Sequence, residues 1–452
     1  MTLILLAALA VVLGAIVASI RGVDVRLTLF VAALALGALG GDLPSVCRTF
    51  FETFSSEKFV VPICTAMGFA YVLRHTGADT QFVRLLMAPV QQVRLLLVPG
   101  VVVVGFLVNV PLISQASTGV CLGTVVVPLM RAAGYSRRTV GSTLLLGASI
   151  GGELLNPGAP ELQTVRDHTG TDTQVLAQQY VPPLIFPLLA VATVAFWLLT
   201  IRLERRGKGD PSSGWPEALA ADAAARPRNL LLAAVPLVPL ALLLLSGPPF
   251  ELFHIPDAWL ALRSNDLPHP EKLLRSRQIG LAMLVGVAAA ALVAPRAAKG
   301  CMRAFFEGTG YGFANIVSVI VIATCFGEGI RVVGLAGALG GFIKGHPSWL
   351  HPLTAAVPGA FAWVSGSGMA STQSLFGFFV EPTGNLNQDA NAVGAMVSVA
   401  SAAGRTMSPV AAIALMCAAL TGESPVALVK RTAGPMLLGL TCVVAMRTLG
   451  WV

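Results

Sequence analysis

One stretch of this chain occurs twice, more than half the chain length apart. Residues 149–159 (SIGGELLNPGA) return as residues 401–411 (SAAGRTMSPVA), with a serine, a glycine, a proline and an alanine all displaced by 252 positions. The tripeptide FFE at residues 50–52 returns at residues 305–307. Because the matched features keep their order, we interpret the chain as two copies of one structural plan.

The composition indicates a membrane protein. Only 12% of the residues are charged and 55% are hydrophobic, whereas soluble chains carry about 25% charged residues. Apolar runs long enough to cross about 30 Å of hydrocarbon recur along the chain. We therefore predict an all-α polytopic membrane protein. In such a chain, matched Gly- and Pro-containing breaks in the two halves are typical of a secondary transporter.

Each half is predicted to hold five transmembrane helices and one re-entrant hairpin. In the first half, the apolar stretch at residues 95–130 is too short for two full helices, since these need about 40 residues and a turn. Its polar centre, Asn109–Thr118, is the expected hairpin tip. The second hairpin is expected at residues 349–380, with its tip at Ser365–Gln373. The alternative is a kinked span followed by a loop.

An odd number of spans in each half requires the halves to have opposite orientations, which makes them inverted repeats. Cytoplasmic loops are rich in Lys and Arg, and one orientation puts most basic clusters inside, including the linker at residues 204–228. The first hairpin then enters from the cytoplasm, the second enters from outside, and both termini are extracytoplasmic. A polar insertion at residues 247–278 falls outside, and residues 298–309 are expected as a separate interfacial helix.

The two hairpin tips are the expected binding site. Helix N-termini carry unpaired N–H groups and a partial positive charge, so two tips that meet in the membrane favour an anion. Side chains that can add polar contacts are Asn109, Ser114, Gln115, Ser117 and Thr118 in the first tip, and Ser365, Ser367, Ser371, Thr372 and Gln373 in the second. The alternative is that these small residues only allow close helix packing.

Two opposite charges occupy equivalent positions of the repeat, Glu153 and Arg405. A charge inside a membrane costs about 2.5–3.5 kcal/mol on insertion scales and usually marks function or a charge pair. Arg405 can clamp a substrate carboxylate, while Glu153 can carry a proton or pair with Arg405. Asn156 and Ser408 can offer oxygen atoms to a coupling cation such as Na⁺. The alternative is a buried structural ion pair.

Other classes of function lack support in the sequence. The seven cysteines and six histidines are dispersed, so we expect no metal site. No nucleophile motif or phosphate-binding loop stands in a suitable context, so we expect neither an enzyme nor a bound cofactor other than Na⁺ or H⁺ as a coupling ion. The net charge of +8 lies in short loops beside apolar runs, which is a topology signal and not a sign of nucleic acid binding.

Three stretches resemble the DcuC family of C4-dicarboxylate carriers within the ion transporter superfamily: Met67–Gly77, Asn109–Thr118 and Gly151–Glu161. The resemblance implies an elevator mechanism, in which a transport domain slides past a dimeric scaffold. It also implies substrates such as succinate, fumarate or malate. With this plan the scaffold comprises residues 1–58 and 229–310, and the transport domain comprises residues 59–203 and 311–452.

We therefore expect a secondary carrier of small organic anions, driven by an ion gradient or by a counter-substrate. Its expected location is the bacterial cytoplasmic (inner) membrane, where it is expected to form a homodimer. A carrier of another carboxylate and an anion channel remain alternatives.

Overall fold

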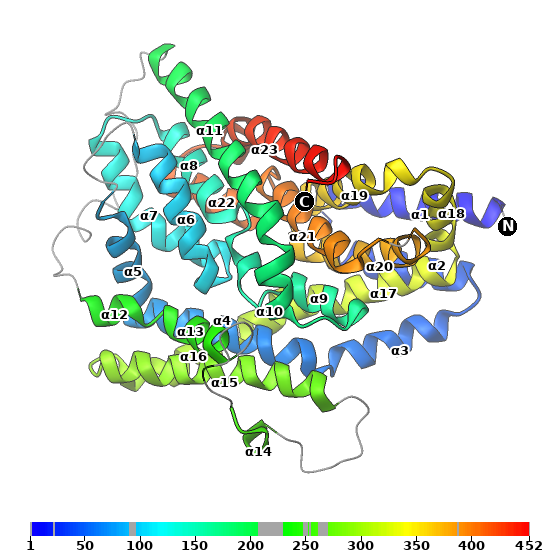
Figure 1. Ribbon diagram of the computed structural model, residues 1–452, viewed down its shortest axis with the longest axis horizontal. Coiled ribbons are helices and arrows are strands. Elements are labelled where there is room, and N and C mark those ends of the chain that lie inside the picture. The colour runs from blue at the N-terminus through cyan, green and yellow to red at the C-terminus, as the bar shows by residue number, and fades with distance from the viewer. Residues whose placement is uncertain are drawn as a thin grey trace.

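The structure, a computed structural model, describes residues 2–20, 23–89, 96–206, 229–246, 252, 255–260, 270–386 and 388–451. Within these ranges all regular secondary structure is helical (Figure 1). The expected linker at 204–228, apart from its first three residues, and much of the insertion at 247–278 lie outside the described residues. The predicted all-α architecture with apolar helices is confirmed.

The helices of the first half end at α11. They are α1 (Thr2–Ile20), α2 (Val25–Leu39), α3 (Leu43–Phe54), α4 (Glu57–Thr76), α5 (Ala78–Met87), α6 (Leu97–Leu112), α7 (Gln115–Ala132), α8 (Arg137–Ser149), η3 (Gly152–Leu155), α9 (Pro160–Thr169), α10 (Thr173–Val175), η4 (Leu176–Tyr180) and α11 (Pro182–Arg206).

The second half begins at α12. Its helices are α12 (Leu230–Ala234), α13 (Leu237–Ser246), α14 (Asp257–Leu260), α15 (Pro270–Val293), α16 (Ala298–Gly312), η6 (Phe313–Val317), α17 (Ser318–Val332), α18 (Leu335–Gly345), η7 (Pro347–Trp349), α19 (Leu350–Ser365), α20 (Gly368–Asn385), α21 (Ala390–Thr406), α22 (Ala412–Thr421) and α23 (Pro425–Thr448).

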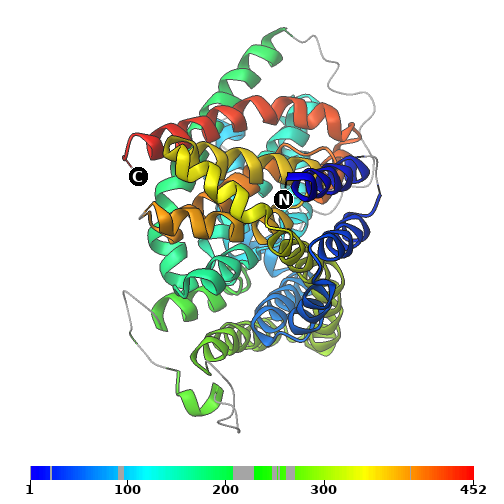
Figure 2. The ribbon, with the colours of Figure 1, turned by 90° about the vertical axis from the view of Figure 1, so that its right-hand side faces the viewer.

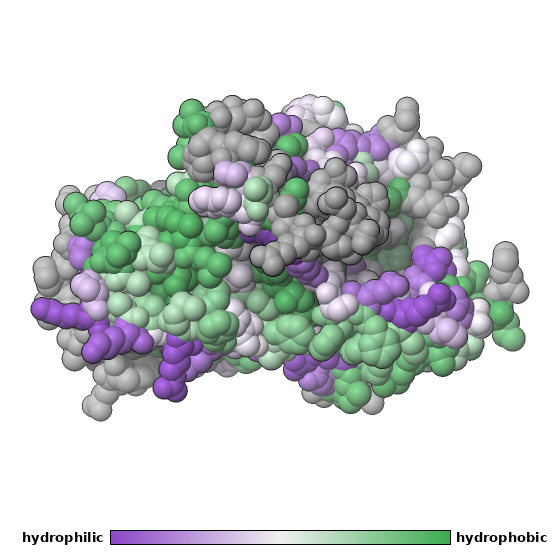
Figure 3. All heavy atoms as spheres, turned by 90° about the horizontal axis from the view of Figure 1, so that it is seen from below, coloured by the Kyte–Doolittle hydropathy of each residue, from purple (hydrophilic) through white to green (hydrophobic). Residues whose placement is uncertain are grey.

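Five helical segments of the described residues are long and apolar enough to cross a membrane. They are Phe59–Thr76, Pro182–Glu204, Ser276–Val293, Ala298–Val332 and Pro425–Thr448. Shorter apolar helices include Leu3–Ala15, Arg26–Leu39 and Ala412–Thr421. Large apolar side chains such as Leu3 and Leu292, each 81% exposed, lie on the outer surface. Figure 3 shows broad hydrophobic areas on one face of the molecule, as lipid contact requires.

Two sequence expectations about helix boundaries need correction. Residues 298–309 do not form a separate helix, because α16, η6 and α17 run on without a break as Ala298–Val332. This run packs closely on α4: a Cβ atom at Gly308 would lie 2.5 Å from the carbonyl oxygen of Met67. The second hairpin also extends beyond residue 380, since α20 continues to Asn385.

The helices form two groups (Figures 1 and 2). In both views α3, α4, α15 and α16 lie below a bundle that contains α6–α9, α11 and α19–α23. The Arg277 guanidinium on α15 binds the Glu57 carboxylate on α4, with Nη2 3.0 Å from Oε2. At the other end of α4, His75 Nε2 is 3.0 Å from the carbonyl oxygen of Ala297, the residue that precedes α16. These contacts fasten the lower group at both ends of α4.

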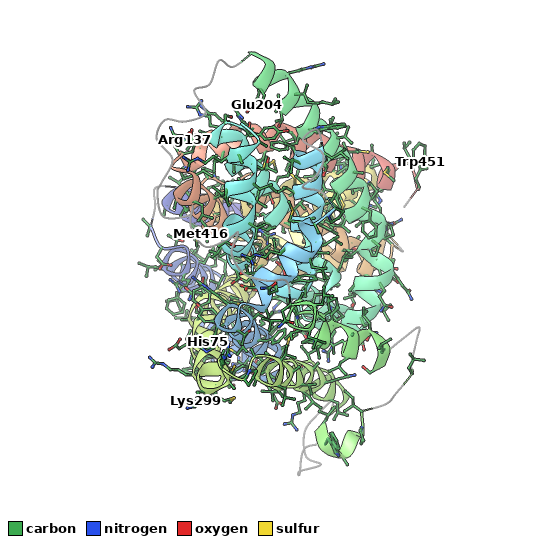
Figure 4. The ribbon with its side chains drawn as sticks, turned by 90° about the vertical axis from the view of Figure 1, so that its left-hand side faces the viewer. His75, Arg137, Glu204, Lys299, Met416 and Trp451 are labelled. Atoms are coloured by element: carbon green, nitrogen blue, oxygen red, sulfur yellow. The ribbon has the colours of Figure 1, made fainter. Side chains whose placement is uncertain are left out.

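Polar side chains tie the bundle together at one end. The Ser136 hydroxyl donates to Glu204 Oε1 over 2.6 Å and thereby joins the start of α8 to α11. Arg431 on α23 donates to the Thr139 hydroxyl over 2.6 Å. Figure 4 shows Arg137 and Glu204 toward one end of the molecule and His75 and Lys299 toward the other.

Corresponding helices of the two halves begin and end in the same way. The C-caps of α9 and α22 are Gly170 (φ 79°) and Gly422 (φ 66°), which are 252 residues apart and have the left-handed backbone that favours glycine. Ser114 and Ser367 precede α7 and α20, and each accepts a hydrogen bond from the N–H group three residues later. The repeat seen in the sequence therefore marks helix ends.

Candidate functional site

Two helical hairpins have short tips. Ile113 and Ser114 join α6 to α7, and Gly366 and Ser367 join α19 to α20. Ile113 has φ 43°, and among the described residues no other non-glycine residue has a positive φ. The corresponding residue of the second tip is Gly366, with φ 71°. A β-branched residue in this region is strained, and such strain is typically retained where the backbone geometry serves a function.

Both tips line one cavity of about 380 Å³, here called the tip cavity. This volume lies in the range of small-molecule sites, about 300–1,000 Å³. The residues that line it are Asp24, Arg26, Met67, Ile113, Ser114, Gln115, Ala116, Glu153, Pro160, Glu161, Tyr311, Asn315, Ile316, Val319, Ser365, Gly366, Ser367, Gly368, Met369, Arg405, Ala411, Ala412 and Ile413.

Four helices begin at this cavity. The first residues of α7, α9, α20 and α22 are Gln115, Pro160, Gly368 and Ala412, and all four line it. The first N–H groups of a helix have no partner within the helix, and each N-terminus acts as roughly half a positive charge. The four ends together favour negative charge in the cavity.

One guanidinium and two carboxylates lie side by side in the cavity wall. Arg405 Nη2 is 2.6 Å from Glu153 Oε1 and also donates to the carbonyl oxygen of Ser149 over 2.9 Å. Arg405 Nη1 is 4.0 Å from Glu161 Oε1. Gln115 from the first tip donates to Glu153 Oε1 over 2.9 Å. The charge pair predicted from the repeat is therefore direct, and it connects the first tip to α21.

The three ionic side chains are shielded from solvent outside the cavity. Glu153, Glu161 and Arg405 are 1%, 2% and 5% exposed. The cavity lining also includes a second pair, Asp24 and Arg26, whose charged groups are 3.2 Å apart. The hydrogen bond from Arg26 lowers the pKa of the Asp24 carboxyl. Arg26 also donates to the carbonyl oxygen of Ala314 over 2.9 Å, which ties the start of α2 to η6.

Some predicted site residues line the cavity and others stand behind it. Ser114, Gln115, Glu153, Ser365, Ser367 and Arg405 line it. Asn109 and Thr118 are fully buried behind the first tip, where Asn109 Nδ2 is 3.4 Å from Thr118 Oγ1 and Asn109 Oδ1 accepts from the Glu153 N–H group. Ser117 is absent from the lining and donates its N–H to Ser114 Oγ.

The second tip shows the same division. Ser371 is buried and donates to the carbonyl oxygen of Pro358 over 2.7 Å, while Ser401 Oγ lies 3.0 Å from its hydroxyl. Thr372 is also buried, and its hydroxyl has no hydrogen-bond partner among the described residues. Both support the hairpin from behind.

Gln373 lines a different cavity of about 600 Å³, together with residues such as His168, Ser374, Glu328 and Arg331. Both polar atoms of the Gln373 amide lack a hydrogen-bond partner among the described residues. This second cavity lies beside α3, α9, α17 and α20. Several polar side chains line it, and water can satisfy the amide there.

Of the three coupling-ion candidates, Glu153 lines the tip cavity, whereas Asn156 and Ser408 are absent from its lining. Asn156 uses its amide within the break after α8: Nδ2 donates to the carbonyl oxygen of Val110 over 2.9 Å, and Oδ1 accepts from the Gly158 N–H group. Ser408 is buried, with no hydrogen-bond partner for its hydroxyl among the described residues.

Sequence reasoning missed Glu161, Tyr311, Asn315 and the pair Asp24–Arg26. Glu161 had a usable signal, because it is an acid in the first turn of a helix that follows the Pro157-containing break. The other residues are brought to the cavity only by packing, and no local pattern in the sequence distinguishes them.

Replacing Ser371 with alanine is expected to destabilise the protein. The change removes one buried hydrogen bond and leaves the Ser401 hydroxyl without an acceptor, at a cost of roughly 1–3 kcal/mol. Thermal unfolding of the purified protein in detergent measures the effect. Ser408→Ala is the matched control, since it removes a hydroxyl with no partner. Equal melting temperatures for the two variants would contradict the assigned role of Ser371.

Comparison with known proteins identifies relatives along most of the chain. The DcuC family, described as C4-dicarboxylate anaerobic carrier, matches residues 57–450. An uncharacterized transporter of Haemophilus influenzae is 29% identical over 210 residues, which cover 46% of this chain and 70% of that protein. The anaerobic C4-dicarboxylate transporter DcuC of Escherichia coli K12 is 32% identical over 146 residues, 31% of each chain.

Two solved structures share the fold. The YdaH transporter of Alcanivorax borkumensis has a TM-score of 0.56 at 15% identity, covering 94% of this chain and 97% of its own. MtrF of Neisseria gonorrhoeae has a TM-score of 0.59 at 14% identity, covering 89% of this chain and 84% of its own. The family resemblance predicted from the sequence is confirmed. Since the family match spans nearly 400 of the 452 residues, the protein belongs to the DcuC family of C4-dicarboxylate anaerobic carriers, a family of integral membrane transporters.

Proposed function

We propose that this protein is a secondary active transporter of C4-dicarboxylates such as succinate, fumarate and malate, which it holds in the tip cavity. The observation that carries the proposal is the convergence of both hairpin tips, four helix N-termini and the Arg405 guanidinium on one cavity. Helix ends and a guanidinium are the groups that bind carboxylates without a metal ion. The E. coli relative, a C4-dicarboxylate transporter by name, supports the same substrate class.

A dicarboxylate needs two positive regions, and the cavity offers them. Arg405 lines the cavity, and its Nη1, which is 4.0 Å from Glu161 Oε1, can donate to one carboxylate of the substrate. The N-terminal turns of α7 and α20 can receive the other, with the Ser365 and Ser367 hydroxyls beside them. A substrate with a single carboxylate would use only one of these regions, so we expect selectivity for dianions.

Alternating access is the proposed mechanism, with the halves as inverted repeats. The matched hairpins and helix caps support the duplication, and the shared fold with two transporters supports a carrier. The proposed transport domain moves past a scaffold as an elevator within a homodimer. Since α4 is held to α15 by the Glu57–Arg277 pair and packs closely on α16, and since one continuous helix, Ala298–Val332, crosses residue 310, we assign α4 and this whole helix to the scaffold, which shifts the domain boundaries from those expected in the sequence. The proposed location is the cytoplasmic membrane with both termini outside, and the coupling ion is Na⁺ or H⁺.

Uptake of labelled succinate into proteoliposomes tests the proposal. Sodium, proton and internal-substrate gradients are imposed one at a time. We expect saturable uptake that fumarate and malate inhibit. At least one gradient is expected to raise the internal succinate concentration above its equilibrium value. No uptake under any gradient would contradict the proposed substrate class. Passive, non-saturating flux that never exceeds equilibrium would instead indicate an anion channel.

A further inference from the structure

Glu161 is the least compensated charge in the tip cavity. Glu153 Oε1 accepts hydrogen bonds from both Arg405 and Gln115, at 2.6 and 2.9 Å. Glu161 is 4.0 Å from Arg405, which is beyond hydrogen-bond distance, and its Oε2 has no hydrogen-bond partner among the described residues. A buried carboxylate oxygen without a hydrogen-bond donor is costly, and protonation of the carboxylate removes that cost.

The remaining charges near the cavity do not neutralise Glu161. Arg26, which also lines the cavity, is paired with Asp24 at 3.2 Å. Arg405 comes from α21 and already holds Glu153, which comes from η3. The cavity lining therefore holds one more carboxylate than guanidinium groups, and a dicarboxylate would add two further negative charges.

A proton on Glu161 would relieve this imbalance. It removes the excess fixed charge, and Arg405 Nη1 then faces a neutral acid and is free to pair with the substrate. The helix N-termini can then stabilise the remaining charge of the substrate. By linkage, a proton that favours the substrate is in turn bound more tightly when the substrate is present.

From this geometry we propose that Glu161 is the proton-binding site of the carrier, which takes up a proton as a dicarboxylate enters the tip cavity and releases it as the substrate leaves. The substrate part rests on the function proposed above. The proton site itself rests on the contacts of Glu161 with its neighbours, and Glu153 is held as the permanent carboxylate partner of Arg405.

The test has one arm that needs no substrate. Difference infrared spectra of the purified protein are recorded during a pH titration in H₂O and D₂O. We expect a carboxylic acid C=O band that disappears as pH rises, is missing from Glu161→Gln and persists in Asp79→Asn. Asp79 is a suitable control because it is a buried acid outside the tip cavity, 6% exposed on α5. The same titrating band in Glu161→Gln would overturn the proposal.

The second arm measures coupling. In the wild type, the Kd for succinate is expected to rise about tenfold per pH unit above the titration of Glu161, since one proton is linked to binding. In Glu161→Gln, Kd is expected to lose this slope, and a pH gradient is expected no longer to drive succinate above equilibrium. Gradient-driven accumulation by Glu161→Gln at the wild-type level would overturn the coupling role.

The two arms separate the possible failures. A Glu161 band in a protein that binds no C4-dicarboxylate would refute the proposed substrate and leave the proton site standing. Succinate transport without a Glu161 band would refute the proton site and leave the proposed substrate standing. If Glu161→Gln does not fold, Glu161→Asp keeps the acid on a shorter side chain. It is expected to shift the infrared band, and an unmoved band would overturn the assignment.

Discussion

Replacing Arg405 with alanine is expected to weaken succinate binding roughly 30-fold or more. Removing one partner of a buried, hydrogen-bonded charge pair costs about 2–5 kcal/mol of binding energy, and each 1.4 kcal/mol is a factor of ten in Kd. Arg405 is the guanidinium that the described part of the chain places beside both Glu153 and Glu161. Calorimetry or a binding-induced shift in melting temperature measures the loss.

The same change is expected to lower stability, because it leaves two buried carboxylates without a counter-charge. Breaking a buried pair costs about 3–5 kcal/mol. The double variant Glu153→Ala/Arg405→Ala removes both partners, so it should recover part of the stability without recovering substrate binding. Arg405→Lys keeps the charge but loses the planar fork, and we expect intermediate binding. A folded Arg405→Ala protein with wild-type affinity would refute the clamp.

Replacing Gly152 or Gly404 with alanine is expected to push a hairpin arm away from the segment packed against it. Gly152 in η3 contacts α6 of the first hairpin, and Gly404 in α21 contacts α19 of the second. A Cβ atom at Gly152 would lie 2.2 Å from the carbonyl oxygen of Phe106 on α6, and one at Gly404 would lie 2.1 Å from that of Gly359 on α19. Backbone atoms cannot rotate away, so the helices must shift. Overpacking of this kind typically costs 1–3 kcal/mol, and here it would also displace the tips and impair transport.

A glycine in open space provides the control. Gly434 lies in α23, and a Cβ atom there would meet no atom within 4 Å. Since alanine favours helix by about 1 kcal/mol over glycine, Gly434→Ala should be neutral or stabilising. Melting temperature and succinate uptake are measured for all three variants. If Gly404→Ala has the same melting temperature and succinate uptake as Gly434→Ala, this result would contradict the close backbone contact between α19 and α21.

These contacts explain why the repeat was visible in the sequence. Gly152 and Gly404 are anchors of the 252-residue repeat, and both lie where a hairpin arm touches the break behind it. Only glycine fits such an approach of two backbones, so the residue is retained in both copies. Glu153 and Arg405 follow the anchors directly, which is why the charge pair could be predicted from the repeat alone.

Other parts of the site could not be predicted in this way. Ser371 and Ser114 look alike in the sequence, since each is a hydroxyl residue near a tip. The fold turns Ser371 inward toward Pro358 and leaves Ser114 at the cavity. The lining residues Asp24 and Tyr311 come from distant segments of the two halves. These residues follow no periodic pattern, so only tertiary packing identifies them.

Substrate protection of cysteines placed at both hairpin tips tests whether the two hairpins form a single substrate site. The seven native cysteines are replaced, and Ala116→Cys and Met369→Cys are introduced separately, one at each tip. Succinate should slow alkylation of both cysteines with the same half-maximal concentration, while butyrate, with one carboxylate, should have little effect. Protection at only one tip, or at neither, would contradict a single substrate site formed by the two hairpins.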